Sequence, residues 1–369
     1  MINYQIADMI PGVQNMIEAA DIRPGDQVLL LADRRSDPPT MEAIAAGLKA
    51  IGATPATLIT EPISRYGEVP PVVFPAMKAS DVVIWVWPVF ITFTPAHRAM
   101  GREREESGTQ LHEQRMRPYM VYFEGTPGLL ARDYARFPNA VLWKLAEKVR
   151  AVVGAGHEVH IEDDLGTNLT ASYDGDRLYG MQFRAGDPPG RCHFPWGRCG
   201  VFNGSGRADG EVYLSCVQGI PGQLPTPMRW KVEDSLVTEV EGGEAAEECR
   251  RLFEAVPGSN RLIEIMFGYH PKASVRHGMA DPMHWELISK MPWAGLGTER
   301  RHPNFRHVDG SILNGRLYID GRIVVHEQGM LDRSLLHDPE VLEVAARYGD
   351  PYEVLAPVSH AAHGSGTLW

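Results

Sequence analysis

The first 150 residues alternate between short apolar runs and helical patterns. The run at 26–33 (DQVLLLAD) follows the turn RPGD and is almost continuously apolar, as is typical of a buried strand. Residues 39–53 (PTMEAIAAGLKAIGA) carry apolar positions at helical spacing and end beside a glycine, and a second helix is expected at 138–152. Further strands are expected at 54–60, within 77–88 and at 119–125. This rhythm predicts a parallel sheet with helices on its faces, which is a doubly wound α/β domain.

The pattern changes after about residue 155. Short β-rich runs now alternate with turns such as YDGD and SGRADGE, and one helix is expected at 243–256 (GEAAEECRRLFEAV). The glycines of NGSGRADG join two expected strands and do not open a helix, so they indicate a turn and not a nucleotide loop. A length of 369 residues also favours two domains. We therefore expect an N-terminal α/β domain over 1–154 and a C-terminal α+β domain over 155–369.

Composition and charge narrow the class of protein. The net charge of -11, without a Lys/Arg-rich block, argues against a nucleic-acid partner. The first residues lack the pattern of a signal peptide, and no apolar run reaches the length of a membrane span. Four cysteines in so long a chain do not make a disulfide framework, and Cys192 and Cys199, seven residues apart and without a CxxC pair, do not support a structural zinc site. We expect a cytoplasmic protein without a membrane partner.

The stretch at 261–271 (RLIEIMFGYHP) places a carboxylate inside an apolar strand. Leu262, Glu264 and Met266 would share one face of that strand. An ionised carboxylate is rarely buried there without a metal ion or a strong partner. Glu264 is therefore predicted to be a metal ligand or an acid/base, with a buried salt bridge to an arginine as the alternative.

A second candidate lies in the segment 305–321 (FRHVDGSILNGRLYIDG). In an extended chain, His307 and Asp309 are two residues apart and project to the same side. A neutral imidazole and a carboxylate aimed at one point suit Zn²⁺, Mn²⁺ or Fe²⁺. A His-x-Asp pair is a weak signal by itself, and its weight here comes from Glu264. These three residues are the predicted ligands of one divalent metal ion.

Histidines are concentrated in the same part of the chain. Five of them fall within 38 residues: His270, His277, His284, His302 and His307. A catalytic site is a common reason for such a cluster near a buried glutamate, although some of the five are expected to be surface or packing residues. His270 and His284 are the candidate catalytic side chains.

Aromatic residues and an arginine mark a candidate substrate pocket. The segment HFPWGR places Trp196 beside Arg198, and KMPWAGLG contributes Trp293. Such pairs occur in pockets for planar or anionic ligands, and the alternative for each residue is a place in the core or on the surface. The absence of G-x-S-x-G and of HExxH argues against a serine hydrolase and a zincin.

Several segments resemble the M29 aminopeptidase family and its relative, 2,5-dihydroxypyridine 5,6-dioxygenase. IRPGDQVLLLAD with IGATPATLIT is similar to the family's N-terminal opening, and LGTNLTASYDGDRL is similar to its Gly-Thr-Asp-Leu-Thr segment. EVEGGEAAE resembles a turn and helix start of the family. IEIMFGYHPKA resembles the aminopeptidases' Glu-Leu-Gly-Ile-Gly-Thr-Asn-Pro stretch, and FRHVDGSIL with LYIDGRIVVHEQG resembles the His-x-Asp segment and closing strands.

The resemblance implies roles for particular residues. Glu264 matches the metal-binding glutamate of the aminopeptidases, where the dioxygenase has a histidine, and His307 and Asp309 match the His-x-Asp ligands of both. At two further aminopeptidase ligand positions this chain has Arg198 and Trp293, so a one-metal site is expected. For the dioxygenase's catalytic histidine, His97 lies in the corresponding region. The resemblance also implies an N-terminal α/β domain, a C-terminal metal domain and a homodimer.

Three functions remain open. The preferred hypothesis is a metal-dependent hydrolase of a small amide-type or heterocyclic, anionic substrate, held by Arg198, Trp196 and Trp293, with one Zn, Mn or Fe ion. A non-haem iron ring-cleaving dioxygenase is the second hypothesis, and a metal-free small-molecule-binding protein is the third. The carboxylate-rich ligand set favours the hydrolase over the dioxygenase, because iron dioxygenases use a triad with two histidines.

Overall fold

The computed structural model describes most of the chain. The described residues are 6–64, 67–89, 94, 119–123, 128–185, 191–218, 220, 222–274, 290–298 and 306–358. Contacts divide the chain into two compact units: Met1–Ala140 with Gln182–Trp196, and Val141–Met181 with Gly197–Trp369. None of the helices in the described ranges combines the length and the apolar character needed to cross a membrane.

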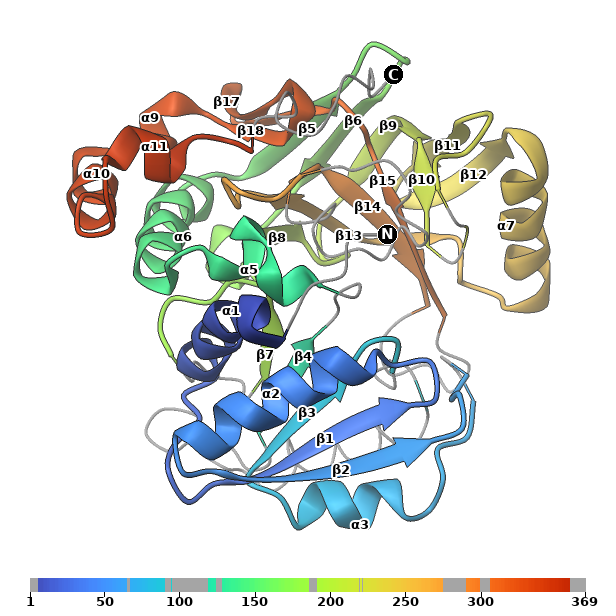
Figure 1. The fold of residues 1–369 in the computed structure, drawn as a ribbon. Coiled ribbons are helices and arrows are strands. Elements are labelled where there is room, and N and C mark those ends of the chain that lie inside the picture. Colours follow the sequence, from blue (N-terminus) through green and yellow to red (C-terminus); the bar gives the residue numbers. More distant parts are fainter. Residues whose placement is uncertain are drawn as a thin grey trace. The chain divides into compact units, whose positions relative to one another are not determined.

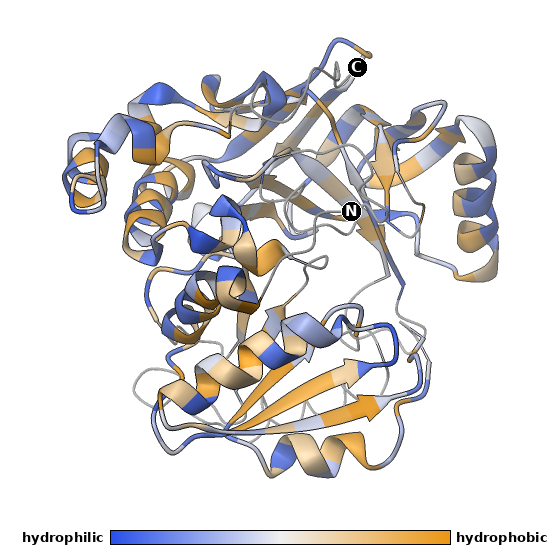
Figure 2. Ribbon diagram, in the orientation of Figure 1, coloured by the Kyte–Doolittle hydropathy of each residue, from blue (hydrophilic) through white to orange (hydrophobic). Residues whose placement is uncertain are grey.

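The first unit is built on a parallel sheet (Figure 1). Five strands of the described residues follow the order β2-β1-β3-β4-β7, and each neighbouring pair is parallel. The strands are β1 (Gln27–Asp33), β2 (Thr54–Thr60), β3 (Val82–Val86), β4 (Tyr119–Phe123) and β7 (Arg191–Phe194). Figure 2 shows the apolar residues gathered on β1, β2 and β3. The continuous apolar runs of β1, β3 and β4 are therefore the inner strands of a sheet covered on both faces, whereas β2 is an edge strand and is largely exposed.

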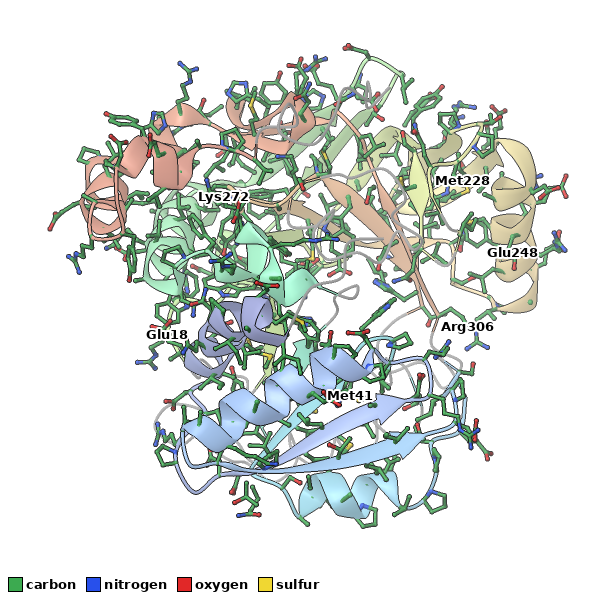
Figure 3. All side chains as sticks on the ribbon, in the orientation of Figure 1. Glu18, Met41, Met228, Glu248, Lys272 and Arg306 are labelled. Atoms are coloured by element: carbon green, nitrogen blue, oxygen red, sulfur yellow. The ribbon has the colours of Figure 1, made fainter. Side chains whose placement is uncertain are left out.

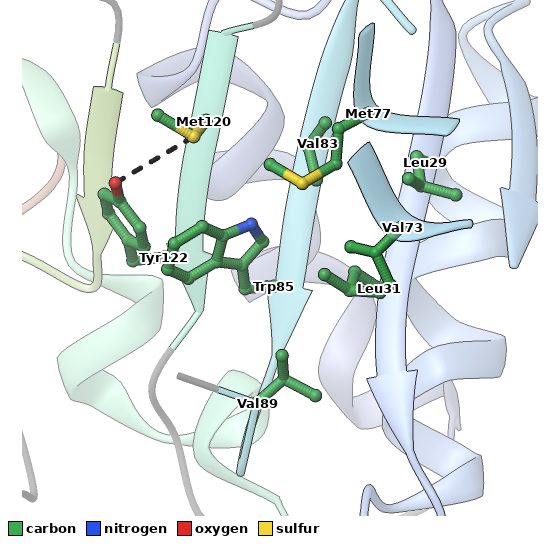
Figure 4. Close-up of a cluster of buried hydrophobic side chains, with 9 residues drawn as sticks. All are labelled: Leu29, Leu31, Val73, Met77, Val83, Trp85, Val89, Met120 and Tyr122. Carbon is green, nitrogen blue, oxygen red and sulfur yellow. Dashed lines mark hydrogen bonds between the residues drawn. The ribbon is translucent and has the colours of Figure 1, made fainter. Parts of the chain in front are cut away.

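Helices lie on both faces of this sheet. Among the described residues, the helices of the unit are α1 (Ile6–Ala19), α2 (Pro38–Ala50), α3 (Val73–Lys78) and α5 (Asp133–Arg136), with a 3-10 turn at Leu129–Ala131. On one face, Val73 and Met77 of α3 pack against a buried cluster of strand residues (Figure 4). On the other face, α2 packs against α1, where Gly47 lets Val13 approach closely (Figure 1). The doubly wound α/β architecture expected from the sequence is confirmed.

Helix α2 shows how local sequence defines an element. Asp37 caps its first turn by accepting a hydrogen bond from the Thr40 backbone N–H at 3.0 Å, and prolines fill the first helical positions. Gly52, with φ of 81°, follows its last turn in the left-handed conformation. The helix predicted at 39–53 is confirmed, with its start one residue earlier and its end three residues earlier than predicted.

The second unit contains a large, mainly antiparallel sheet. Its strands follow the order β10-β15-β14-β13-β12-β11-β9-β6-β5-β16-β17-β18 in the described residues, and β8 pairs with β13. The strands are β5 (Glu158–Glu162), β6 (Asn168–Ser172), β8 (Arg198–Phe202), β9 (Ala208–Leu214), β10 (Cys216–Val217), β11 (Met228–Glu233), β12 (Leu236–Glu241), β13 (Arg261–Gly268), β14 (Trp293–Gly297), β15 (His307–Ser311), β16 (Arg316–Ile319), β17 (Arg322–His326) and β18 (Met330–Leu331). The α+β character expected for this part of the chain is confirmed.

The helices of the second unit flank this sheet. In the described residues they are most of α6 (Asn139–Gly154), α7 (Gly243–Ala255), α9 (Arg333–Leu336), α10 (Pro339–Ala345) and α11 (Pro351–Leu355), with 3-10 turns at Gly175–Arg177 and Glu327–Gly329. Lys272, labelled in Figure 3, donates from Nζ to the backbone oxygens of Glu353 and Ala356. That contact ties the segment after β13 to the end of α11, as a lysine at a helix C-terminus does.

The two units are not separated by the single boundary expected at residue 154. The chain passes from the first unit to the second after Ala140, and residues 182–196 return to the first unit. The Tyr173 hydroxyl donates to the Val153 carbonyl oxygen at 2.6 Å, and Lys144 pairs with Glu340 at 3.2 Å. Most of α6 therefore belongs with the large sheet. The segment 182–196 returns to the first unit, because β7 extends the parallel sheet beside β4.

Candidate metal centre

Three neighbouring strands bring Glu264, His307 and Asp309 together. β14 lies between β13 and β15, and Gly295 is paired with Glu264 on one side and with Asp309 on the other. His307 is paired with Gly297, two residues farther along β14. Directly paired residues project to the same face of a sheet, and so do residues two apart. The three side chains therefore share one face.

The distances among these side chains suit a single ion. His307 Nε2 lies 3.1 Å from Glu264 Oε2 and 2.7 Å from Asp309 Oδ1. One ligand atom from each residue falls within 4.8 Å of the other two. Donors bound about 2.1 Å from a divalent cation lie roughly 3 Å apart, so this set fits such an ion. Glu264 and His307 are buried, and Asp309 is partly buried.

Gly295 leaves open the space that these ligands surround. A Cβ atom on Gly295 would lie 2.6 Å from Asp309 Oδ1, 3.2 Å from the Glu264 Cβ and 3.2 Å from His307 Cε1. Any other residue would thus push against all three side chains. Because Gly295 on β14 has no side chain, the carboxylates of Glu264 on β13 and Asp309 on β15 can approach the same ion from both sides. Gly295 was not among the residues predicted from the sequence, where its only signal is the Ala-Gly-Leu-Gly run of β14.

The electrostatics of the cluster are dominated by its two carboxylates. Burial alone lowers the pKa of His307, but the adjacent Asp309 and Glu264 carboxylates outweigh burial and raise that pKa to about 9. The metal-free imidazole is therefore protonated at neutral pH and balances part of the negative charge. A cation that binds here replaces that proton, as expected for a histidine ligand.

Met266, Trp293 and Ser311 form the next row of side chains on the same face. Trp293 is paired with Met266 on one side and with Ser311 on the other, and all three are buried. This row lies one step along the strands from Glu264 and Asp309. Trp293 therefore contributes an aromatic surface beside the ligand cluster.

Arg198 lies farther along the same face. It is paired with Gly268 at the end of β13, four residues from Glu264, and it is buried. A Cβ on Gly180 would lie 2.6 Å from Met266 Cε and 3.8 Å from Arg198 Nε. The Met266 methyl group and Arg198 Nε therefore both lie near Gly180, and Met266 lies between Glu264 and Gly268, the partner of Arg198, along β13.

The other candidate residues lie elsewhere. His270 is buried, its Nδ1 accepts a hydrogen bond from the Lys272 backbone N–H at 3.1 Å, and it is not part of the ligand cluster. Trp196 belongs to the first unit, where its indole N–H donates to Asn139 Oδ1 at 3.4 Å. His284 lies outside the described residues, as do three further histidines of the sequence analysis: His97, His277 and His302. Catalytic and substrate-binding roles for these residues stay predictions.

Comparison with known proteins identifies the family. Residues 8–279, well over half of the chain, match a family model described as 2,5-dihydroxypyridine 5,6-dioxygenase. The chain belongs to the 2,5-dihydroxypyridine 5,6-dioxygenase family. The description of the family names an enzyme, 2,5-dihydroxypyridine 5,6-dioxygenase. A comparison with curated proteins gives no match.

Two solved structures share the fold. The structure of 2,5-dihydroxypyridine dioxygenase from Pseudomonas putida KT2440 is 16% identical, with a TM-score of 0.69, and the match covers 92% of this chain and 99% of that one. Wild-type AmpT from Thermus thermophilus is 14% identical, with a TM-score of 0.60, and covers 88% and 99%. At these identities the similarity establishes the fold alone. The resemblance to the M29 aminopeptidases and to the pyridine dioxygenase is confirmed.

Proposed function

We propose that this chain is a mononuclear metal-dependent hydrolase that acts on a small, planar, anionic substrate of the amide or heterocyclic type. The observation that carries the proposal is the ligand set on the two sides of Gly295, where Glu264 and Asp309 meet His307. Two carboxylates neutralise a divalent cation. A site with two carboxylates and one histidine suits Mn²⁺ or Zn²⁺, whereas non-haem iron oxygenases hold their iron with two histidines and one carboxylate. When bound, such a cation would polarise a substrate carbonyl and lower the pKa of water.

In this proposal, Trp293 and Arg198 bind the substrate and orient it beside the ligand cluster. Trp293 offers an aromatic face beside the ligands, and Arg198 offers a guanidinium farther along the same sheet face. A guanidinium grips a carboxylate through two parallel hydrogen bonds, and an aromatic surface packs against a planar ring. Burial of Glu264 and His307 limits the water that reaches them. Together these features favour a flat, negatively charged molecule over a free peptide.

Arg198 and Trp293 are the reason why we propose a single metal ion. Both stand where the resemblance to the aminopeptidases places further metal ligands, and neither side chain can ligate a cation. The Arg198 charge would also repel a second ion. The centre is therefore expected to hold one metal per chain.

The family match favours a second function. A non-haem iron dioxygenase that opens a dihydroxylated pyridine ring is supported by the family model over 8–279 and by the structural similarity to the Pseudomonas enzyme. In that case Glu264, His307 and Asp309 would hold iron, and the aromatic surface of Trp293 would lie against the ring. Glu264 departs from the histidine of the dioxygenase, which is why we place this function second.

Metal analysis and oxygen uptake separate these functions. The protein would be purified without added metal, its metal content measured by plasma mass spectrometry, and its turnover of anionic aromatic amides and of pyridine diols followed with and without oxygen. About one manganese or zinc per chain with turnover under anaerobic conditions supports the hydrolase. Iron with stoichiometric oxygen uptake on a pyridine diol supports the dioxygenase. A chain that binds none of these metals with micromolar affinity contradicts both and favours the metal-free binding protein.

A further inference from the structure

Gln218 contacts Asp309 through both its backbone and its side chain. The backbone N–H of Gln218 donates to the Asp309 carbonyl oxygen at 2.8 Å and extends the pairing of β10 with β15 by one residue. Its side-chain amide nitrogen donates to Asp309 Oδ2 at 3.2 Å. Gln218 was not among the residues that the sequence pointed to.

The two oxygens of Asp309 therefore face different partners. Oδ1 belongs to the ligand cluster and lies 2.7 Å from His307 Nε2, while Oδ2 accepts the hydrogen bond from Gln218. A carboxylate held in this way presents one oxygen to an ion, because the other oxygen is occupied and the plane of the group is fixed. The donor is a neutral amide, so it orients Asp309 without cancelling the negative charge that attracts a cation.

We propose that Gln218 is a positioning residue that holds Asp309 as a one-oxygen ligand. This proposal rests on the metal centre proposed above. Without the amide, Asp309 can rotate and offer both oxygens to the ion or turn from it. Metal affinity and coordination number would then change, although none of the three ligands is altered.

The position of the Gln218 backbone does not depend on its side chain. Cys216, two residues earlier, is paired with Ser311 and packs in a buried cluster with Met291 and Leu313. The Leu224 N–H closes the following loop by donating to the Ser215 carbonyl oxygen at 2.8 Å. A change of the Gln218 side chain should therefore leave β10 in place, so that a variant tests the amide and not the fold.

The test compares Gln218→Met with Gln223→Met, an identical change at an exposed position of the same loop. Affinity for Mn²⁺ and Zn²⁺ would be measured by competition with a chelator, and unfolding of the metal-free proteins by circular dichroism. Gln218→Met should weaken metal binding about 10- to 100-fold, the usual effect of losing a partner of a ligand. It should also change the visible spectrum of the Co²⁺-loaded protein, which reports coordination number. Gln223→Met should match the wild type in both, and all metal-free proteins should show the wild-type circular dichroism spectrum and unfold cooperatively.

Asp309→Ala separates failure of this proposal from failure of the metal centre. If Asp309→Ala loses the metal while Gln218→Met keeps wild-type affinity and the wild-type Co²⁺ spectrum, the positioning role is wrong and the centre stands. If Asp309→Ala binds metal like the wild type, the centre itself is wrong. In the Asp309→Ala background, Gln218→Met should have no further effect on the metal affinity that remains. If Gln218→Met fails to fold, Gln218→Asn, whose amide is one methylene group shorter and is expected to lose the 3.2 Å hydrogen bond, carries the same expectations.

Discussion

Gly295 lies directly opposite Asp309 in the β14–β15 ladder, and a methyl group on Gly295 would come within 2.6 Å of Asp309 Oδ1. Real Cβ atoms do not approach an oxygen so closely, so the carboxylate would have to move. The glycine is thus as much a part of the candidate metal centre as the ligands on the strands beside it.

Gly295→Ala is expected to abolish tight metal binding. Loss of a residue that only holds a ligand in place lowers metal affinity by up to roughly 100-fold. The methyl group of Gly295→Ala displaces a ligand itself, so metal affinity should fall by at least that factor. Metal affinity would be measured by chelator competition. Gly154→Ala, where a Cβ would meet only ordinary contacts beyond 3.5 Å, is the control and should leave affinity unchanged. Wild-type affinity in Gly295→Ala would show that the ion does not lie between Glu264 and Asp309.

Metal affinity is expected to rise with pH. Because the pKa of His307 is raised to about 9, a proton must leave before the imidazole can ligate, and affinity should increase up to about pH 9. Isothermal titration between pH 6 and pH 9, in buffers with different ionisation enthalpies, would give both the affinity and the protons released. Affinity that is constant across this range would contradict the raised pKa.

The stability of the metal-free protein is expected to change in the opposite direction. A raised pKa in the folded state means that protonated His307 stabilises the fold fully below its unfolded pKa of about 6.5, and that this stabilisation is lost as pH rises through about 9. The melting temperature without metal should therefore fall over this interval. His307→Gln, which does not titrate, should remove that part of the fall, and an identical pH profile in the variant would contradict the assignment to His307.

Arg198→Ala is expected to raise KM strongly for the true substrate. Loss of a charge-assisted hydrogen-bonded pair costs roughly 1.5–3 kcal/mol, which is a loss of about 10- to 150-fold in kcat/KM. Metal content should stay the same, since Arg198 is not a ligand. If Arg198→Ala keeps wild-type kinetics while His307→Ala is inactive, the anion-anchor role of Arg198 is wrong.

A homodimer is expected from the family resemblance. The chain has a mass of 40.9 kDa, so light scattering coupled to gel filtration should give about twice that mass at micromolar concentration. A single species of one-chain mass at that concentration would contradict this expectation.

The order and type of many elements could be read from the sequence, because they depend on residues close together in the chain. The apolar run at 26–33 became β1, and the one-sided pattern at 39–53 became α2. The shared direction of His307 and Asp309 is also local, since residues two apart on any strand project to the same side. Glu264 stood out because a charge interrupts an apolar strand.

Other features depend on which strands become neighbours. Gly295 and Gln218 matter because β14 lies between β13 and β15 and because β10 pairs with β15, and these pairings join residues that are from 10 to 95 positions apart. The return of 182–196 to the first sheet and the packing of α6 with the second unit have the same origin. A sequence specifies which side chains can act as ligands through local chemistry. Only strand register, which tertiary packing selects, determines that the glycine is opposite the carboxylate and that the amide reaches its outer oxygen.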